Sequence, residues 1–370
     1  MRLNHIDVAR ALCIVLVVVG HSAIGKHHGH VNEILASFRM PLFLIISGTF
    51  FQPQRDLREI LNRKTDSLLK PYLSLALLYA PFYFLTIGRN EDALNYGLNV
   101  MSFNGVAMPG WLFPLWFLTL LWALHTGGAL FVRLTRFDHL PKSGQLLWIV
   151  LLLWSGHVCL NALWMRLVQV GDLSWHLEGL PFNLDLWPLT AAFFFTGYTL
   201  KQEIRRNAPS WQLVCAAALL FATVHLLYHP SVSLLQRRYT DFAVNAAAAF
   251  SGTLVLIGLS HAIARSQLAT RGLAYLGRLS LYILMFHAPV LSLSGKFLAT
   301  RLPGYPVATE CVAIALSLAV SLILGRLIES TPVIRPFFEP MRQAPRTAAI
   351  KLNTMPLRAH QEDTDTREAA

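Results

Sequence analysis

An arginine and a histidine lie eleven residues apart in the first apolar stretch of the chain, "DVARALCIVLVVVGHSA" (residues 7–23). Each residue of an α-helix turns the chain by about 100° and advances it by about 1.5 Å. Arg10 and His21 are therefore expected on one helix face, about 16 Å apart along the axis. An arginine can hold an anion through two parallel hydrogen bonds. A histidine, whose ordinary pKa is about 6.5, can accept a proton near neutral pH.

Other interpretations of this pair stay open. Arg10 could extend toward the nearby headgroups, and His21 could lie in the opposite membrane interface beside Ser22. Asp7 precedes Arg10 by three residues, a spacing that allows an ion pair on a helix. Asp7 could also be an ordinary charge at the membrane edge.

The composition indicates an integral membrane protein. Of 370 residues, 54% are hydrophobic and only 14% are charged, whereas soluble domains have about 25% charged residues. The net charge of +11 is typical of basic residues that gather at the cytoplasmic edge of a membrane. We therefore expect membrane lipid as a partner and, because no recognition motif accompanies the charge, no nucleic acid. The four cysteines show no CxxC spacing, so neither a disulfide framework nor a zinc site is expected.

Ten apolar segments approach the length of about 20 residues that a membrane helix needs. They lie near 6–25, 34–51, 71–88, 114–132, 146–168, 186–200, 211–229, 242–262, 279–298 and 309–328. We therefore predict an all-α, polytopic membrane protein with about ten transmembrane helices.

The distribution of basic residues predicts the orientation. If the N-terminus is cytoplasmic, the inside loops carry twice as many Lys and Arg residues as the outside loops. An even number of spans then places the C-terminus in the cytoplasm as well. Residues 1–330 are expected to form the membrane domain, and residues 331–370 a disordered tail that is first basic and then acidic. The longest outside loops, 89–113 and 169–185, could form a lid or serve as plain connectors.

Five features recur in an order that marks a family. They are Arg10–x10–His21 after Asp7, "FRMPLF…ISG" at 38–48, a basic loop ending in Lys70–Pro71–Tyr72, "LWFL" at 115–118 and "LGRLSLYILMFH" at 276–287. With these features the chain resembles the acyltransferase-3 family of membrane-bound O-acyltransferases over roughly residues 5–330. It is most similar to the branch that includes fucose 4-O-acetylase-like proteins.

This resemblance implies an activity. Members of the family transfer an acyl group, usually acetyl, from acyl-CoA to a hydroxyl of a glycan or related acceptor. The resemblance thus implies an O-acyltransferase of the bacterial inner membrane that takes acyl-CoA as co-substrate and a carbohydrate or cell-envelope acceptor, with no metal and no other cofactor. Arg10 would hold an anionic part of the donor, and His21 would be the general base. Direct transfer is favoured because no GxSxG motif is present, although an acyl-histidine step remains an alternative.

Several further residues are candidates for donor binding or for support of the site. Arg39 could bind donor phosphate or stabilise an oxyanion, or it could form an ion pair with an acid in another span. The basic-loop residues Arg63, Lys64 and Lys70 could receive the CoA phosphates, or they could be ordinary inside charges.

Three aromatic or imidazole residues complete the candidate site. His287 lies among apolar residues in the ninth segment and could support the site or simply bond to a neighbouring helix. Trp116 and Tyr282 are expected to line or wall the cavity. The stretch "KHHGH" at 26–30 is not expected to bind a metal, because adjacent histidines rarely preform a tetrahedral site.

A membrane transporter or flippase of a glycan or lipid-linked saccharide is the alternative function. Polar residues within spans also line transport paths, typically in repeated halves with interrupted helices. The interrupting residues here, such as Pro41, Gly48, Pro81 and Pro289, do not pair between two halves.

Overall fold

The computed structural model describes residues 3–86, 93–106, 108, 110–170, 173–302 and 304–340, which are mostly helical. The helices are α1 (Asn4–His21), α2 (Ala23–His27), α3 (Gly29–Thr49), α4 (Leu57–Lys64), α5 (Lys70–Thr86), α6 (Ala93–Met101), α7 (Trp116–Thr135), α8 (Lys142–Leu163), α9 (Trp187–Thr199), α10 (Lys201–Arg206), α11 (Trp211–Tyr228), α12 (Phe242–Ile263), α13 (Gln267–Arg278), α14 (Ser280–Arg301), α15 (Pro306–Ser330) and α16 (Arg335–Phe338). Two antiparallel hairpins pair β1 (Leu167–Val170) with β2 (Leu173–His176) and β3 (Val232–Ser233) with β4 (Arg238–Tyr239). The predicted all-α class is confirmed.

Nine helical stretches among the described residues are long and apolar enough to cross a membrane. They are Asn4–His21, Gly29–Thr49, Leu57–Leu85, Gly110–Thr135, Lys142–Leu163, Trp211–Tyr228, Phe242–Ile263, Ser280–Arg301 and Pro306–Ser330. The third joins α4 to α5 through a π-helical turn at Thr65–Leu69, and the fourth adds a 3₁₀ turn, Gly110–Leu115, before α7. The prediction of a polytopic membrane protein is therefore confirmed.

The sixth predicted segment, 186–200, differs from the others. It forms α9, whose 13 residues are too few for the helix to be among the nine. Protein surrounds α9, because Phe193, Phe194 and Phe195 are completely buried. A helix enclosed by other helices need not match the full lipid thickness, since its ends continue into protein rather than into hydrocarbon.

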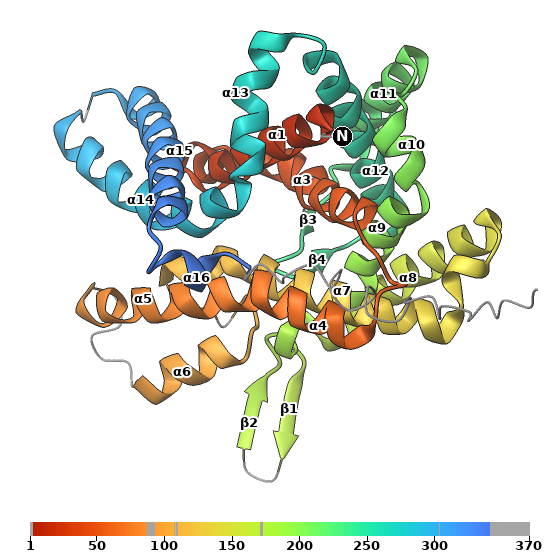
Figure 1. Cartoon of the computed structure of the whole chain (residues 1–370), viewed down its shortest axis with the longest axis horizontal. Helices are drawn as coiled ribbons and strands as arrows, with labels where there is room; N and C mark the ends of the chain where they lie inside the picture. The colour runs from red at the N-terminus through yellow and green to blue at the C-terminus, as the bar shows by residue number, and fades with distance from the viewer. Residues whose placement is uncertain are drawn as a thin grey trace, which may run out of the picture.

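Helix α1 lies in the middle of the molecule. It runs beside α3 and is also contacted by α12, α13 and α14 (Figure 1). Its residues Val8, Ala11 and Ile14 are fully buried. The helix ends at His21 because Ser22 adopts an extended backbone, and the Ser22 side chain accepts a hydrogen bond from the backbone N–H of Gly25 in α2. Because other helices surround most of α1, its polar residues are in contact mainly with protein.

The end of the bundle that holds the start of α1 is called the Arg10 face here. At this end, the His5 ring is 3.0 Å from the backbone oxygen of Ile204 in α10. Lys142, which begins α8, donates a hydrogen bond to Glu203 in the same helix α10. The start of α8 and the end of α9 thus lie on one face, so the short helix α9 crosses the bundle.

The opposite end is called the His21 face. It holds α2, the start of α3 and the β3–β4 hairpin, and the rings of His30 and His229 are 5.9 Å apart there. The backbone N–H of Ala23 donates to Glu310 near the start of α15. Three long connections, those before α7, before α9 and around β3–β4, lie toward this face.

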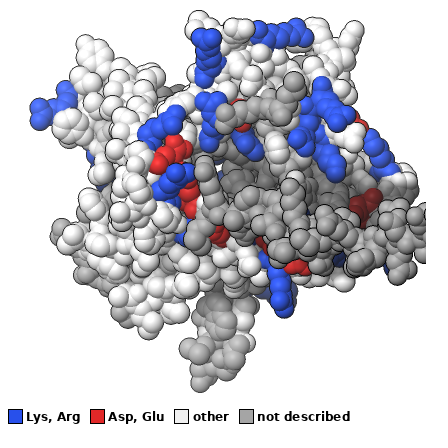
Figure 2. Space-filling view, in the orientation of Figure 1, with Lys and Arg blue, Asp and Glu red and all other residues white. Residues whose placement is uncertain are grey.

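Basic side chains gather on the Arg10 face. Figure 2 shows Lys and Arg residues over α10 and α13, where Arg205, Arg206, Arg271 and Arg278 are exposed. Such a distribution is typical of a cytoplasmic surface. The cytoplasmic N-terminus stays a prediction, with this charge distribution in its favour.

The packed structure continues beyond residue 330. Helix α16 lies against α5 (Figure 1), and Phe338 is buried. Lys70 donates to the backbone oxygen of Glu339, and Ser74 donates to that of Phe337. Most of the predicted tail, residues 341–370, lies outside the described residues.

The crossing of α8 and α9 generates a stability prediction. A Cβ atom at Gly156 would lie 2.4 Å from the backbone nitrogen of Leu189, whereas one at Gly144 in the same helix would meet nothing closer than 3.4 Å. Gly156→Ala should therefore lower the free energy of unfolding by about 1–3 kcal/mol. Gly144→Ala should preserve it or raise it by up to about 1 kcal/mol, because alanine favours helix. Thermal unfolding of both purified variants in one detergent measures this, and equal stabilities would contradict the packing described.

Candidate active site

One cavity, of about 320 Å³, is lined by both Arg10 and His21. Ile14 and Val17 line it between them, so four residues of α1 face the same space. Their spacings of four, three and four residues keep them on one stripe of the helix. The prediction that Arg10 and His21 share a face is therefore confirmed.

The remaining walls of the cavity are mostly apolar. Helix α3 contributes Met40, Phe43, Ile46 and Ser47; the start of α7 and the turn before it contribute Pro114, Trp116, Phe117, Leu118 and Leu121; α14 contributes Ser280, Leu281 and Leu284; Ser67 and Leu68 come from the turn before α5. A mostly apolar cavity with a cation in its wall suits a ligand that is uncharged except at one end.

Arg10 has partners on the side of the Arg10 face. Its Nη1 atom is 3.9 Å from an Asp7 carboxylate oxygen, and its side chain keeps 32% of its exposure. Its guanidinium also lies 5.1 Å from the centre of the Phe50 ring. The predicted pairing with Asp7 is therefore present, but it leaves part of the guanidinium accessible for an anion.

His21 lies where three elements meet. Its ring packs in a T-shaped arrangement with the Phe113 ring, with 4.9 Å between ring centres, and stacks on the His287 ring at 5.4 Å. Phe113 belongs to the turn before α7, and His287 belongs to α14. The imidazole is thus oriented by two rings from other parts of the chain.

His287 lies behind His21 and is completely buried. Its Nδ1 atom is 2.9 Å from the backbone oxygen of Ile283 and 3.1 Å from that of Leu284. Because carbonyl oxygens only accept, this assigns the ring proton to Nδ1. Its Nε2 atom is buried without a hydrogen-bond partner in the described part of the chain. His287 therefore lies next to His21, and its supporting role stays a prediction.

Arg39 does not line this cavity. Its guanidinium packs against Gly20 and donates to the backbone oxygen of Leu16 and to the side chain of Asn32. Among the described residues no carboxylate lies within 4.0 Å of it, so the ion pair considered from the sequence is not seen. The contacts of Arg39 join α3 to α1 next to His21.

Four other predicted residues also lie outside the cavity wall. Arg63 pairs with Glu59 on the surface, and Lys70 contacts Asp66 and the backbone of Glu339. Tyr282 donates to Glu339, close to the end of α16. The Lys64 ammonium lies 3.2 Å from Nε2 of His125. Of the candidates named from sequence, the cavity brings together Arg10, His21 and Trp116, with His287 directly behind.

Some residues of the site carry no clear signal in the sequence. Ser47 lines the cavity, and its hydroxyl is 3.4 Å from Nε2 of His125, which also contacts Lys64. Ser47 belongs to the "ISG" stretch used for the family resemblance, so that motif was its only signal. His125 and Phe113 reach the site from elements whose packing no local pattern predicts. No cluster of three metal-ligating side chains occurs in the described part of the chain.

Comparisons with known proteins place this site in a family. A family model described as an acyltransferase domain, of the acyltransferase-3 type, matches residues 3–326, from α1 into α15. A search of curated proteins and a search of solved structures each found no match. The likeness to the fucose 4-O-acetylase branch stays a prediction. The match includes every residue that lines the cavity, and the chain belongs to the acyltransferase-3 family.

Proposed function

We propose that this membrane protein transfers an acyl group from acyl-CoA, bound from the Arg10 face, to a hydroxyl of an acceptor that reaches the His21 face. One observation carries the proposal: a single cavity is lined by a cation at one end of the α1 stripe and by an imidazole at the other. Those are the groups that an anionic donor and a hydroxyl acceptor require.

Arg10 would bind a phosphate of the donor. Its guanidinium is partly exposed, and among the described residues Asp7 is the one carboxylate paired with it, at a long distance of 3.9 Å. The neighbouring Arg205, which also lies 5.1 Å from Phe50, adds positive charge to this entrance. The thioester arm would then run along Ile14 and Val17 through the apolar part of the cavity.

His21 would act as general base. As the acceptor oxygen attacks the thioester carbon, His21 takes the hydroxyl proton. The tetrahedral intermediate then collapses, the C–S bond breaks and CoA leaves as a thiolate, which recovers the proton from the imidazolium. The products are an ester and CoA–SH, and His21 returns to its neutral form.

The surroundings of His21 support this role. The stacked ring of His287 and the T-shaped contact with Phe113 restrict the His21 ring, so the ring loses little further freedom when the substrates bind. The walls near the ring are apolar, which limits the access of water to the thioester.

The proposed substrates are those usual for the family. Acetyl is proposed as the acyl group because members of the family usually transfer acetyl. A carbohydrate or other cell-envelope hydroxyl is proposed as acceptor, and the bacterial inner membrane is proposed as the location, with the basic Arg10 face in the cytoplasm. A saccharide flippase would need a polar path for the saccharide, and the cavity walls between Arg10 and His21 are mostly apolar.

His21→Ala should reduce acyl transfer by about 10²- to 10⁴-fold, because the hydroxyl would lose its base. His27→Ala is the matched control. His27 lies in α2 on the His21 face of the bundle, and its ring contacts the backbone oxygen of Ala23 in its own helix. Incorporation of labelled acetyl from acetyl-CoA into membrane glycans measures both variants at equal protein content. Full activity of His21→Ala would rule out this residue as the base.

Arg10→Ala should raise the KM for acetyl-CoA by about 10- to 100-fold, since a hydrogen-bonded charge contributes about 1.5–3 kcal/mol. Arg10→Lys should lie between the variant and the wild type, because lysine keeps the charge but loses the two-pronged geometry. The control is Arg206→Ala, an exposed arginine of the same face. An unchanged KM for acetyl-CoA in Arg10→Ala would contradict the phosphate role.

A further inference from the structure

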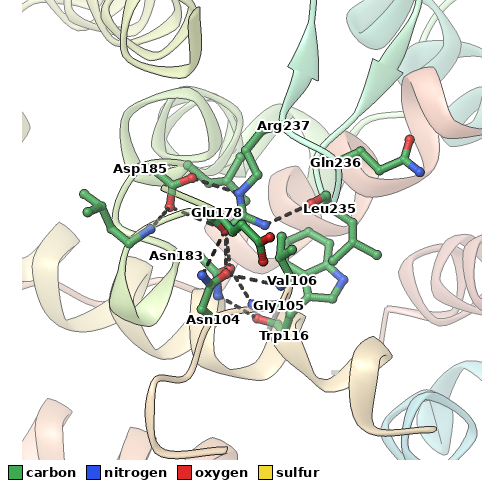
Figure 3. Close-up of polar contacts among 12 residues, drawn as sticks. Asn104, Gly105, Val106, Trp116, Glu178, Asn183, Asp185, Leu235, Gln236 and Arg237 are labelled. Carbon is green, nitrogen blue, oxygen red and sulfur yellow. Dashed lines mark hydrogen bonds and ion pairs between the residues drawn. The ribbon is translucent and has the colours of Figure 1, made fainter. Parts of the chain in front are cut away.

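A buried polar cluster joins three connections on the His21 face. It consists of Arg237, Asp185, Asn183 and Asn104, and is called the Arg237 cluster here (Figure 3). Asn104 precedes α7, Asn183 and Asp185 precede α9, and Arg237 lies between β3 and β4. Up to 133 positions separate these residues in sequence, so the cluster exists only in the folded chain.

Arg237 is the centre of the cluster. Its side chain is completely buried and that of Asp185 is 3% exposed, with 2.8 Å between Nε and Oδ2. Nη2 donates to Asn104 at 2.9 Å and to Asn183 at 3.0 Å. Nη1 donates to the backbone oxygen of Leu235 at 2.9 Å. One guanidinium therefore fixes all three connections at once.

Asn183 connects the cluster to the start of α7 by hydrogen bonds. Its Oδ1 accepts from Arg237 and from the backbone N–H of Gly105 at 3.1 Å. Its Nδ2 donates to the backbone oxygen of Trp116 at 3.4 Å and to the Thr119 hydroxyl at 3.1 Å. A Cβ atom at Gly105 would lie 2.5 Å from Cβ of Trp116, so this connection packs directly on Trp116.

The backbone around the cluster is held in an unfavourable form. Phe103, Phe182, Asn183 and Arg237 all have φ between 53° and 56°, the left-handed region that non-glycine residues rarely adopt. Such backbone persists where its surroundings determine it, and it is frequent near functional sites. The rings of Phe103 and Phe182 stack at 4.5 Å, which connects two of these strained turns.

The segment held by the cluster reaches the reacting end of the cavity. Residues 110–116 include Phe113, which contacts the His21 ring, and Pro114 and Trp116, which line the cavity. Asn183 holds the end of this segment through the backbone of Trp116. A displacement of the cluster would therefore move the wall that faces His21.

We propose that Arg237, Asp185 and Asn183 are positioning residues for acyl transfer: they hold residues 113–116 against His21 and keep water from the thioester when no acceptor is bound. The inference rests on the proposed function and adds to it a means of directing the acyl group to the acceptor. No residue of the cluster lines the cavity.

Stability alone does not account for such a cluster. A buried ion pair loses the hydration of both charges, and well-packed apolar residues often stabilise a fold as much or more. What an ion pair with a planar guanidinium supplies is a defined geometry, because each donor must meet its own acceptor. The cluster supplies that geometry to the segment that contacts His21.

A looser wall would admit water in place of the acceptor. Water would then give its proton to His21 and attack the thioester carbon, and cleavage of the C–S bond would yield a carboxylic acid and CoA–SH. The quantity to measure is the ratio of this hydrolysis to transfer, because a general loss of folded protein lowers both rates together.

The test uses the double variant Asp185→Asn/Arg237→Gln, which removes both charges and so avoids leaving one buried alone. The full-length protein is supplied with acetyl-CoA labelled in the acetyl group, in its own membranes. Label in the glycan fraction measures transfer, and label released as acetate measures hydrolysis. We expect the hydrolysis-to-transfer ratio to rise on the order of tenfold or more, as expected for a small displacement near reacting groups.

Two controls separate positioning from stability and from charge. Gly258→Ala strains the packing of α12 against α11, where a Cβ atom would lie 2.5 Å from Cγ2 of Val214, away from the cavity and the cluster, and should leave the ratio unchanged. Lys142→Gln/Glu203→Gln removes an exposed ion pair on the opposite face and should also leave it unchanged. An unchanged ratio in Asp185→Asn/Arg237→Gln would overturn the inference.

If the double variant does not accumulate in the membrane, a milder variant provides the test. Asn104→Ala keeps the ion pair and removes one acceptor of Arg237, so the ratio should rise by a smaller factor. An unchanged ratio in Asn104→Ala would then overturn the inference. Wild-type protein that neither transfers nor hydrolyses acetyl, succinyl or longer acyl-CoA would overturn the proposed function, and this inference with it.

Discussion

The proposed chemistry depends on the placement of α1 at the centre of the helix bundle. A cation and an imidazole would be costly on a lipid-facing helix, but α1 is contacted by α3, α12, α13 and α14, and its Arg10–His21 stripe faces a cavity. The helix thus fixes two groups of different chemistry at a separation set by its own rise of about 1.5 Å per residue. The surrounding helices exclude lipid from that stripe and supply the apolar walls between its ends.

Two kinds of polar structure support this stripe. Close to it, His287 and Phe113 orient His21, while Asp7 lies beside Arg10. Farther away, the Arg237 cluster fixes the connections of the His21 face. The charged groups of this cluster are paired and hydrogen-bonded, which is the condition under which buried charges are tolerated. In this arrangement the groups proposed for the chemistry are few, and many others hold them in place.

The sequence predicted the fold class and the core of the site, because both depend on local periodicity. Long apolar segments predicted the helices, and the eleven-residue spacing predicted that Arg10 and His21 share a face. Helix α9 was harder, since only its enclosure by other helices explains how 13 residues cross the bundle. Arg39, Lys64 and Lys70 were plausible donor contacts by type and location, but none of them lines the cavity, and their role in donor binding stays a prediction. Arg237 and Asp185 could not be paired from sequence, because their proximity arises only from the packing of distant connections.

The most direct test is a structure of the protein with an acetyl-CoA analogue that cannot transfer its acyl group. The measurement is the position of two parts of the analogue, the phosphates and the carbonyl carbon. We expect the phosphates at Arg10, the arm along Ile14 and Val17, and the carbonyl carbon close enough to His21 for an acceptor hydroxyl to fit between them. An analogue bound outside this cavity, or with its carbonyl far from His21, would contradict the account.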